Sequence, residues 1–116
     1  SDLVCSPTSA DAFTQAVLAL LTAPQPSPGI YHLTAEGACS WAEFAAEAFG
    51  LSGVNCRIVA VDRKGDYGRI RRPAYSVLGN IRGRALGIKL PHWKDDLARY
   101  LQKQPECAGV QVEAPR

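Results

Sequence analysis

The chain has 116 residues, of which 47% are hydrophobic and 21% are charged, and its formal net charge is +2. This length fits one small domain and is too short for a two-domain enzyme. The composition is that of an ordinary globular protein, and so small a net charge gives no reason to expect a nucleic-acid-binding protein.

The hydrophobic residues do not form a membrane span or a targeting signal. The longest apolar run, residues 16–21, is far below the about 20 residues that a span requires. No charged segment followed by an apolar one opens the chain, so we expect no signal peptide and a cytoplasmic protein. The chain also contains no Met, and we expect it to be trimmed or to be a piece of a longer protein.

The first predicted element is a helix over residues 8–21, because apolar residues recur there with helical spacing. Thr8 is the expected N-cap and Asp11 lies three residues later, close to the usual start signal. Three prolines between positions 24 and 28 end this helix.

A βαβ unit is predicted next. Residues 29–34 form the first strand, and Ser40 with Glu43 forms a capping box that opens a helix ending at Gly50 or Gly53. Residues 56–62 alternate as a second strand would. The crossover rule makes the two strands parallel and the connection right-handed, so the predicted fold class is α/β, a small mixed domain with three or four helices.

The remaining elements are short. Residues 75–78 are expected to form a bridge-like strand, and residues 81–86 a brief helix that Gly87 caps. Pro91 is placed to start a last helix, whose apolar stripe includes Trp93 and Leu97. We therefore expect one folded domain over residues 1–103 and a flexible tail over residues 104–116.

The strongest candidate site is a basic loop. Five of the 13 Lys and Arg residues fall within ten positions: Arg63, Lys64, Arg69, Arg71 and Arg72. Guanidinium groups bind phosphate through paired donors, and α/β proteins place ligands in loops that follow parallel strands. On composition alone, a solvated loop is the slightly stronger interpretation. Pro73 shifts the balance toward a site, because it forces extended geometry on Arg72 and gives its side chain a defined direction.

Other polar and aromatic residues are weaker candidates. Trp41, in the first turn of a helix, could line a cleft, although such a tryptophan more often packs in the core. Ser76 has no adjacent base and is not a nucleophile, but its hydroxyl could bind a ligand oxygen. His32 and His92 lack a second metal ligand and are expected to be structural. We predict no catalytic or metal-binding residue, and Gly79, Gly83 and Gly87 do not have the spacing of a dinucleotide-binding loop.

Four cysteines are widely spaced, at positions 5, 39, 56 and 107. Their number is compatible with two disulfides, and no C-x-x-C pair is present. Reduced thiols are the expected state in a reducing cytoplasm.

Three groups of motifs, in their combined order, resemble the C-terminal part of the dTDP-4-dehydrorhamnose reductases, which are extended short-chain dehydrogenases/reductases. They are Ser6-Pro-Thr8 before an Ala/Leu-rich helix, Gly29-Ile-Tyr-His-Leu33 with Gly37-Ala-Cys-Ser-Trp-Ala-Glu-Phe-Ala45, and Arg72-Pro-Ala-Tyr-Ser-Val-Leu78 with Arg84-Ala-Leu-Gly-Ile88 and Leu90-Pro-His-Trp93. The resemblance covers the chain up to about residue 104. Departures occur where the family usually has Asp and a Lys-Leu pair, and this chain has Gly79, Arg82 and Gly83.

The resemblance implies an enzyme that transfers a hydride from NADPH to the 4-keto group of a dTDP-linked sugar, making dTDP-L-rhamnose. In that family the NADPH site and the Tyr-x-x-x-Lys pair belong to an N-terminal Rossmann domain. The chain would bind the nucleotide sugar beside that domain, with no cofactor of its own, and would be inactive alone. Arg72 would contact the diphosphate, with Ser76, Trp41 and Thr8 near or supporting the cleft. Homodimer formation stays open, and neither nucleic acid nor membrane is an expected partner.

Two other functions remain open. A non-catalytic relative would resemble the regulatory beta subunit of methionine adenosyltransferase, in which a reductase-like fold binds a partner protein. An unrelated anion- or RNA-binding module would use the basic loop and would show steep salt dependence. The few aromatic residues near that loop make the RNA-binding module the weakest of the three hypotheses.

Overall fold

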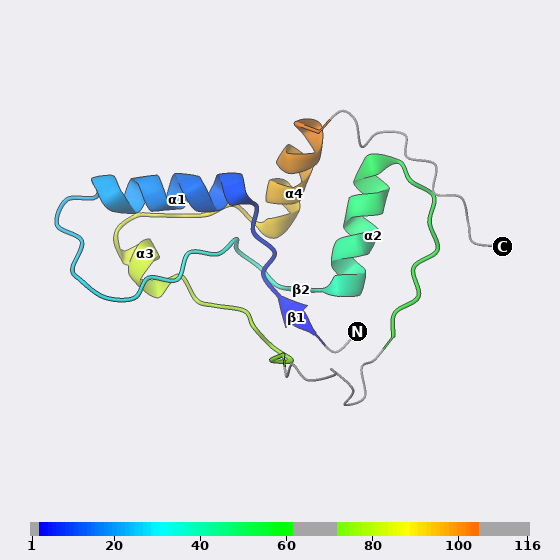
Figure 1. Cartoon of the computed structure of the whole chain (residues 1–116), viewed down its shortest axis with the longest axis horizontal. Coiled ribbons are helices and arrows are strands. Elements are labelled where there is room, and N and C mark those ends of the chain that lie inside the picture. The colour runs from blue at the N-terminus through cyan, green and yellow to red at the C-terminus, as the bar shows by residue number, and fades with distance from the viewer. Residues whose placement is uncertain (1–2, 62–71, 105–116) are drawn as a thin grey trace.

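A computed structural model describes residues 3–61 and 72–104. Within them lie four helices and two short strands (Figure 1), in the order β1 (Val4–Cys5), α1 (Ala10–Thr22), β2 (Cys39–Ser40), α2 (Trp41–Ser52), α3 (Ile81–Ala85) and α4 (Trp93–Gln102). The fold is therefore mixed α/β, and helices supply most of its regular structure. The expected tail begins at the edge of the described residues, and its character stays a prediction.

Helix α1 confirms the first predicted helix, but its N-cap is Ser9. The Ser9 hydroxyl accepts the Ala12 N–H at 3.0 Å, whereas the Thr8 hydroxyl accepts the Ala35 N–H at 2.9 Å. The helix ends before Pro24, as expected.

The apolar residues of α1 lie only partly in the core. Ala16 is buried, and Ala12, Val17 and Leu20 pack around the same cluster. Phe13 and Leu21, two further apolar residues of this helix, are exposed.

Helix α2 begins with the predicted capping box. Ser40 Oγ accepts the Glu43 N–H at 3.2 Å, and Glu43 Oε2 accepts the Ser40 N–H at 2.7 Å. The helix continues through Gly50 and ends at Gly53, whose φ of 68° is the left-handed conformation that glycine adopts most readily.

The predicted βαβ unit is wrong. Residues 29–34 run without strand pairing, and none of the described residues 56–61 lies in a strand. The two strands that form are β1 and β2, and they are antiparallel, with Val4 opposite Ser40 and Cys5 opposite Cys39.

Two physical reasons account for this error. A parallel strand needs cover on both faces, and Val59 and Val61 are exposed. Side chains also supply partners that a neighbouring strand would supply, because Asn80 bonds the backbone of Thr34. The strand-like pattern of residues 29–34 and 56–61 was therefore not sufficient to predict that these segments pair in a sheet.

Parallel pairing survives as two isolated bridges. Tyr75 pairs with Val4, which confirms the bridge-like strand expected at residues 75–78, and Glu36 pairs with His92. His92 is also the N-cap of α4, and its Nδ1 accepts the Lys94 N–H at 3.3 Å. The helix therefore begins at Trp93, two residues after the expected start at Pro91. The brief helix before Gly87 is confirmed as α3.

The core consists of two clusters joined by residues 33–39. One lies beneath α1 and contains Ala16, Leu33, Ile88 and Leu90. The other contains Ala35, Cys39, Trp93 and Leu97, with Phe44 and Ala48 of α2 packed against it. Figure 1 shows α2 and α4 side by side and α1 extending away from them. No helix within the described residues has the length and apolar character needed to cross a membrane.

Candidate functional site

Val4 joins the two segments that carry most of the predicted site residues. Its N–H donates to the Ala74 carbonyl at 2.8 Å, and its carbonyl accepts the Ser76 N–H at 2.9 Å. On its other side Val4 pairs with Ser40, the N-cap of α2. Residues 74–76 and the start of α2 therefore flank β1.

Ser76 stands on this ladder with its hydroxyl partly engaged. Its Oγ donates to the Val4 carbonyl at 3.3 Å, and the residue is exposed. The hydroxyl oxygen keeps its acceptor capacity. A ligand oxygen that needed the proton would have to compete with Val4.

Trp41 is the first residue of α2, and 54% of its surface is exposed. Its ring packs edge-on against Phe44, with 6.0 Å between the ring centroids. Phe44 in turn lies 6.0 Å from the ring of Trp93 in the core. Trp41 is thus not a core residue, and its exposed indole is supported by the half-buried Phe44, which packs in turn on the buried Trp93.

Arg72 lies at the edge of the described residues, two positions before Ala74, and is exposed. The other four cations of the predicted cluster, Arg63, Lys64, Arg69 and Arg71, lie outside the described residues. The strand that was expected to place this loop does not form, so the argument from parallel-strand topology no longer supports Arg72.

Thr8 makes its side-chain hydrogen bonds to other parts of the chain. Its hydroxyl donates to the Ser6 carbonyl at 3.0 Å and accepts the Ala35 N–H at 2.9 Å. Both hydroxyl contacts are made inside the protein, so Thr8 supports residues 34–36.

Asn80, which the sequence did not single out, follows the segment that carries Arg72 and Ser76 and anchors its end to residues 34–36. The residue is 2% exposed. Its Oδ1 accepts the Thr34 N–H at 2.9 Å, and its Nδ2 donates to the Thr34 carbonyl at 2.7 Å and to Glu36 Oε1 at 3.1 Å. No local signal marks this residue, because its partners lie more than 40 positions earlier in the chain.

Glu36 connects Asn80 to Arg84. Both carboxylate oxygens lie 3.0 Å from Arg84 Nη2. The hydrogen bond from Arg84, followed by the one from Asn80, lowers the pKa of Glu36. The Glu36 backbone also bonds Pro91 and Trp93. Segment 34–36 therefore receives bonds from residue 8, from Asn80 and from the start of α4.

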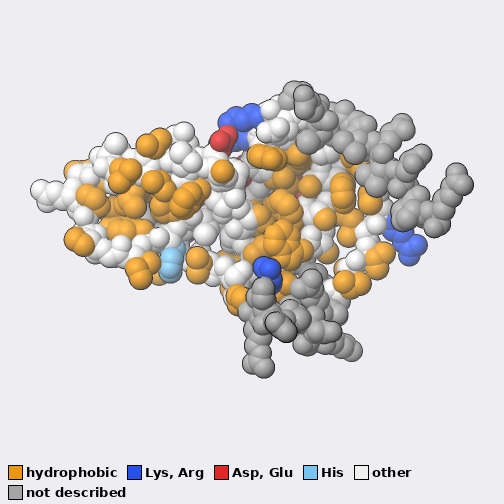
Figure 2. Space-filling view, viewed as in Figure 1, with side chains coloured by type: hydrophobic (Ala, Val, Ile, Leu, Met, Phe, Trp, Pro, Cys, Tyr) orange, Lys and Arg blue, Asp and Glu red, His pale blue; other side chains and the backbone are white. Residues whose placement is uncertain are grey.

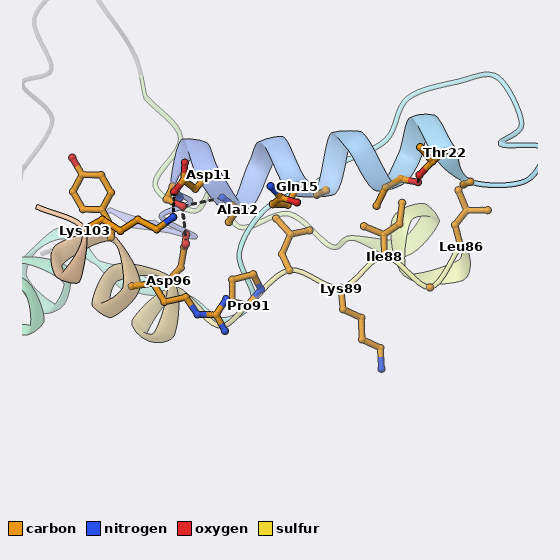
Figure 3. A pocket seen from close by; sticks show the side chains of 18 of the residues that line it. Asp11, Ala12, Gln15, Thr22, Leu86, Ile88, Lys89, Pro91, Asp96 and Lys103 are labelled. Carbon is orange, nitrogen blue, oxygen red and sulfur yellow. Dashed lines mark hydrogen bonds and ion pairs between the residues drawn. The ribbon is translucent and has the colours of Figure 1, made fainter.

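A cavity of about 550 Å³ lies between α1 and residues 86–91 (Figure 3). Figure 3 shows Ile88 pointing toward α1 and Lys89 pointing away from it. At one end Asp96, which is 5% exposed, accepts the Ser9 N–H at 2.7 Å and the Ser9 hydroxyl at 2.6 Å. None of the four predicted site residues lines this cavity.

A second hollow, of about 350 Å³, is almost wholly apolar and lies between α2, α4 and residues 7–9. Figure 2 shows hydrophobic side chains gathered in this part of the molecule. Thr8 is the predicted site residue that lines it, beside Phe44 and Leu97. Among the residues that the structure describes, no three His, Cys, Asp or Glu side chains are grouped as metal ligands.

The fold and these motifs match a known family. A family model described as "RmlD substrate binding domain" matches residues 1–105. The chain belongs to this family. The resemblance seen in the sequence to the dTDP-4-dehydrorhamnose reductases is thereby confirmed.

Curated relatives of this RmlD-type domain carry related names. The chain is 40% identical over 105 residues to the "Spore coat polysaccharide biosynthesis protein SpsK" of Bacillus subtilis, covering 90% of this chain and 36% of that protein. It is 36% identical over 90 residues to a dTDP-4-dehydrorhamnose reductase of Streptomyces griseus, covering 76% of this chain and 30% of the relative. The chain thus spans about a third of the length of these relatives.

Solved structures agree with this membership. The dTDP-4-dehydrorhamnose reductase of Clostridium acetobutylicum is 31% identical, with a TM-score of 0.80 over 89% of this chain and 36% of that one. The corresponding reductase of Bacillus anthracis, solved in complex with NADP, is 26% identical with the same TM-score and the same coverage.

Proposed function

We propose that this chain binds the dTDP-linked sugar in a dTDP-4-dehydrorhamnose reductase, while a nucleotide-binding part outside the chain transfers a hydride from NADPH. Membership of the RmlD substrate-binding family supports this function. The observation that carries it to particular residues is the ladder around Val4, where Ser76 and the first turn of α2 flank one strand.

In this proposal Arg72 binds the diphosphate of the nucleotide sugar. A guanidinium group can bind two phosphate oxygens at once, and the exposed Arg72 leads into a segment whose backbone is fixed on β1. The exposed face of Trp41 and the acceptor oxygen of Ser76 would complete the contacts, and Thr8 would act from behind through segment 34–36.

The described glycines do not fit a dinucleotide site. Helices α1, α2 and α4 begin after Ser9, Ser40 and His92, and no glycine-rich loop precedes any of them. At Gly83 a Cβ atom would lie 2.9 Å from Leu33 Cδ2, so this glycine serves helix packing. In this proposal NADPH is bound by the part of the reductase outside this chain.

Titration of dTDP into the longer reductase that contains this chain tests the proposal. Arg72→Ala should weaken the affinity about 10- to 100-fold, because a charge-assisted pair is lost. Arg57→Ala removes another exposed arginine of the described chain and should leave the affinity unchanged.

An Arg72→Ala protein that binds dTDP as tightly as the parent would remove Arg72 from the site. Equal affinity for dTDP and for inorganic phosphate, in the parent protein, would contradict a nucleotide-sugar site altogether. Steep salt dependence together with RNA binding would favour the anion- or RNA-binding alternative.

A further inference from the structure

Cys5 and Cys39 lie opposite each other in the antiparallel pair of β1 and β2, although they are 34 positions apart in the chain. Both carry free thiols in this structure. Cys39 is 2% exposed and Cys5 is half-buried, so Cys5 is the more accessible residue of the pair.

The hydrogen bonds of Val4 determine whether Cys5 and Cys39 are a hydrogen-bonded or a non-hydrogen-bonded pair of the antiparallel ladder. Val4 directs its N–H and carbonyl toward Ala74 and Ser76. Because successive residues of a strand direct these groups to opposite edges, the polar groups of Cys5 face β2. Cys5 and Cys39 therefore form a hydrogen-bonded pair of the ladder, for which the Cα atoms are about 5.5 Å apart.

This separation suits a covalent link. Disulfides join residues whose Cα atoms are about 4.4–6.8 Å apart. Side chains of directly opposed residues also lie on the same face of a sheet, so the two sulfur atoms point the same way. The Cα separation and the shared face therefore suit a disulfide. The Cβ atoms of a hydrogen-bonded pair are about 5.5 Å apart and those of a disulfide about 3.5–4.5 Å, so the two short strands must move closer together locally as the bond forms.

We propose that Cys5 and Cys39 are a disulfide-forming site, oxidised by a low-molecular-weight disulfide such as oxidised glutathione. The Cys5 thiolate attacks one sulfur of glutathione disulfide, forming a mixed disulfide and releasing one glutathione thiolate. The Cys39 thiolate then attacks the Cys5 sulfur and releases the second glutathione. Two protein thiols are oxidised, one glutathione disulfide is reduced, and both protons pass through solvent to the released thiolates.

The bond would fasten two sides of the Val4 ladder. On one edge β1 holds residues 74–76, and on the other it meets the N-cap of α2. A Cys5–Cys39 disulfide would join β1, which holds residues 74–76, covalently to β2, which leads into α2. Any effect of this bond on ligand binding depends on the proposed function, whereas the disulfide itself does not.

Both thiols are protonated at neutral pH, which sets the rate of the reaction. Burial raises the pKa of Cys5. For Cys39 burial, followed by the neighbouring Cys5 thiol and Glu43, raises the pKa to about 11, against the opposing influence of Lys94. Because the thiolate is the attacking species, formation of the disulfide should become faster as the pH rises from 7 to 9.

The test uses the 116-residue chain with Cys56→Ser and Cys107→Ser, which leaves only the proposed pair of its four cysteines. Equilibration at pH 8 in glutathione redox buffers, followed by acid quenching and mass spectrometry, gives the effective concentration of one thiol toward the other. We expect a monomeric product that has lost two hydrogen atoms. The effective concentration should be at least about tenfold higher in native buffer than in concentrated urea, because folding holds the thiols together.

A matched variant identifies the first step. With Cys39→Ser added, oxidised glutathione should leave a stable mixed disulfide on Cys5. The proposal is overturned if the two-cysteine protein accumulates mixed disulfides on both residues, forms only disulfide-linked dimers, keeps both thiols at pH 9, or shows no higher effective concentration in native buffer than in urea.

Discussion

Asn80 and Thr34, 46 residues apart in the chain, bond each other as two strands would. The side-chain oxygen of Asn80 accepts the Thr34 N–H at 2.9 Å, and its side-chain nitrogen donates to the Thr34 carbonyl at 2.7 Å. The buried side-chain amide of Asn80 thus makes the two hydrogen bonds that a residue of a neighbouring strand would make. It also joins the loop that follows Ser76 to segment 34–36.

Removal of this amide should destabilise the fold. Asn80→Ala leaves the Thr34 N–H and carbonyl without their partner, and we expect a loss of about 2–4 kcal/mol in the free energy of unfolding. Asn80→Asp should cost at least as much at neutral pH, because a carboxylate would face Glu36 Oε1 in place of a donor. Urea denaturation followed by circular dichroism measures both.

The neighbouring Gly79 provides the control for Asn80. A Cβ atom there would contact only the Ile81 side chain, at 3.6 Å. Gly79→Ala should therefore change the free energy of unfolding by less than about 0.5 kcal/mol. Equal effects at positions 79 and 80 would show that the amide contacts do not matter.

The link between Ser9 and Asp96 should also be strong. Asp96 is buried, and it accepts hydrogen bonds from both the N–H and the hydroxyl of the α1 N-cap. Asp96→Ala should lower the free energy of unfolding by about 2–3 kcal/mol, since hydrogen bonds to a charged group are lost. Asp95→Ala, an exposed change in the same helical turn, should lie within about 0.5 kcal/mol of the parent. Thermal denaturation of the parent and the two variants measures these changes in stability. Equal losses at positions 95 and 96 would contradict a stabilising Ser9–Asp96 contact.

Two helical glycines should respond oppositely to alanine. In α2, a Cβ atom at Gly50 would meet nothing within 4 Å, so Gly50→Ala should stabilise the protein by about 0.5–1 kcal/mol through helix propensity. In α3, a Cβ atom at Gly83 would lie 2.9 Å from Leu33 Cδ2, and Gly83→Ala should cost about 1–3 kcal/mol through overpacking. Stabilisation by both variants in urea titrations would contradict the close packing of α3 on Leu33.

Acid should weaken the contacts of Glu36. Because Arg84 and then Asn80 lower its pKa in the folded protein, Glu36 stabilises the fold above its unfolded pKa, near 4.5. This contribution disappears as the pH falls from that value through the lowered folded value. Urea denaturation between pH 7 and pH 3 should show a difference between the parent and Glu36→Gln that shrinks toward acid pH.

Arg84→Ala supplies the matched variant for Glu36. It removes the largest cause of the lowered pKa, so its own dependence of stability on pH should be shallower than that of the parent. A parent protein and an Arg84→Ala protein with the same pH dependence would exclude this ion pair as a source of stability.

Local signals predicted α2 well and α1 less completely. Ser40 and Glu43 bond each other within one helical turn, so their spacing was sufficient to place the start of α2. At the start of α1, Thr8 and Ser9 can both cap a helix, and the sequence indicated Thr8. The choice of Ser9 depends on Asp96, which lies 87 positions away.

The candidate site was predicted in part. The motif that contains Arg72 and Ser76 resembled the reductase family, and the family match confirms that resemblance. The residues that hold this segment in place, Val4 and Asn80, carried no local signal, because one acts through its backbone and the other through partners on segment 34–36. The roles of Arg72, Ser76, Trp41 and Thr8 toward a ligand stay predictions.

The sequence by itself determined the helices and the family, because capping residues, helical apolar spacing and motif order are written in neighbouring positions. Only the tertiary structure decided how the extended segments pair. Alternation along residues 56–61 describes the two faces of one segment but not its partner, and these residues lie in no strand. Segment 34–36 instead bonds Thr8, Asn80 and Pro91, because buried backbone groups take whichever partner the packing brings within reach.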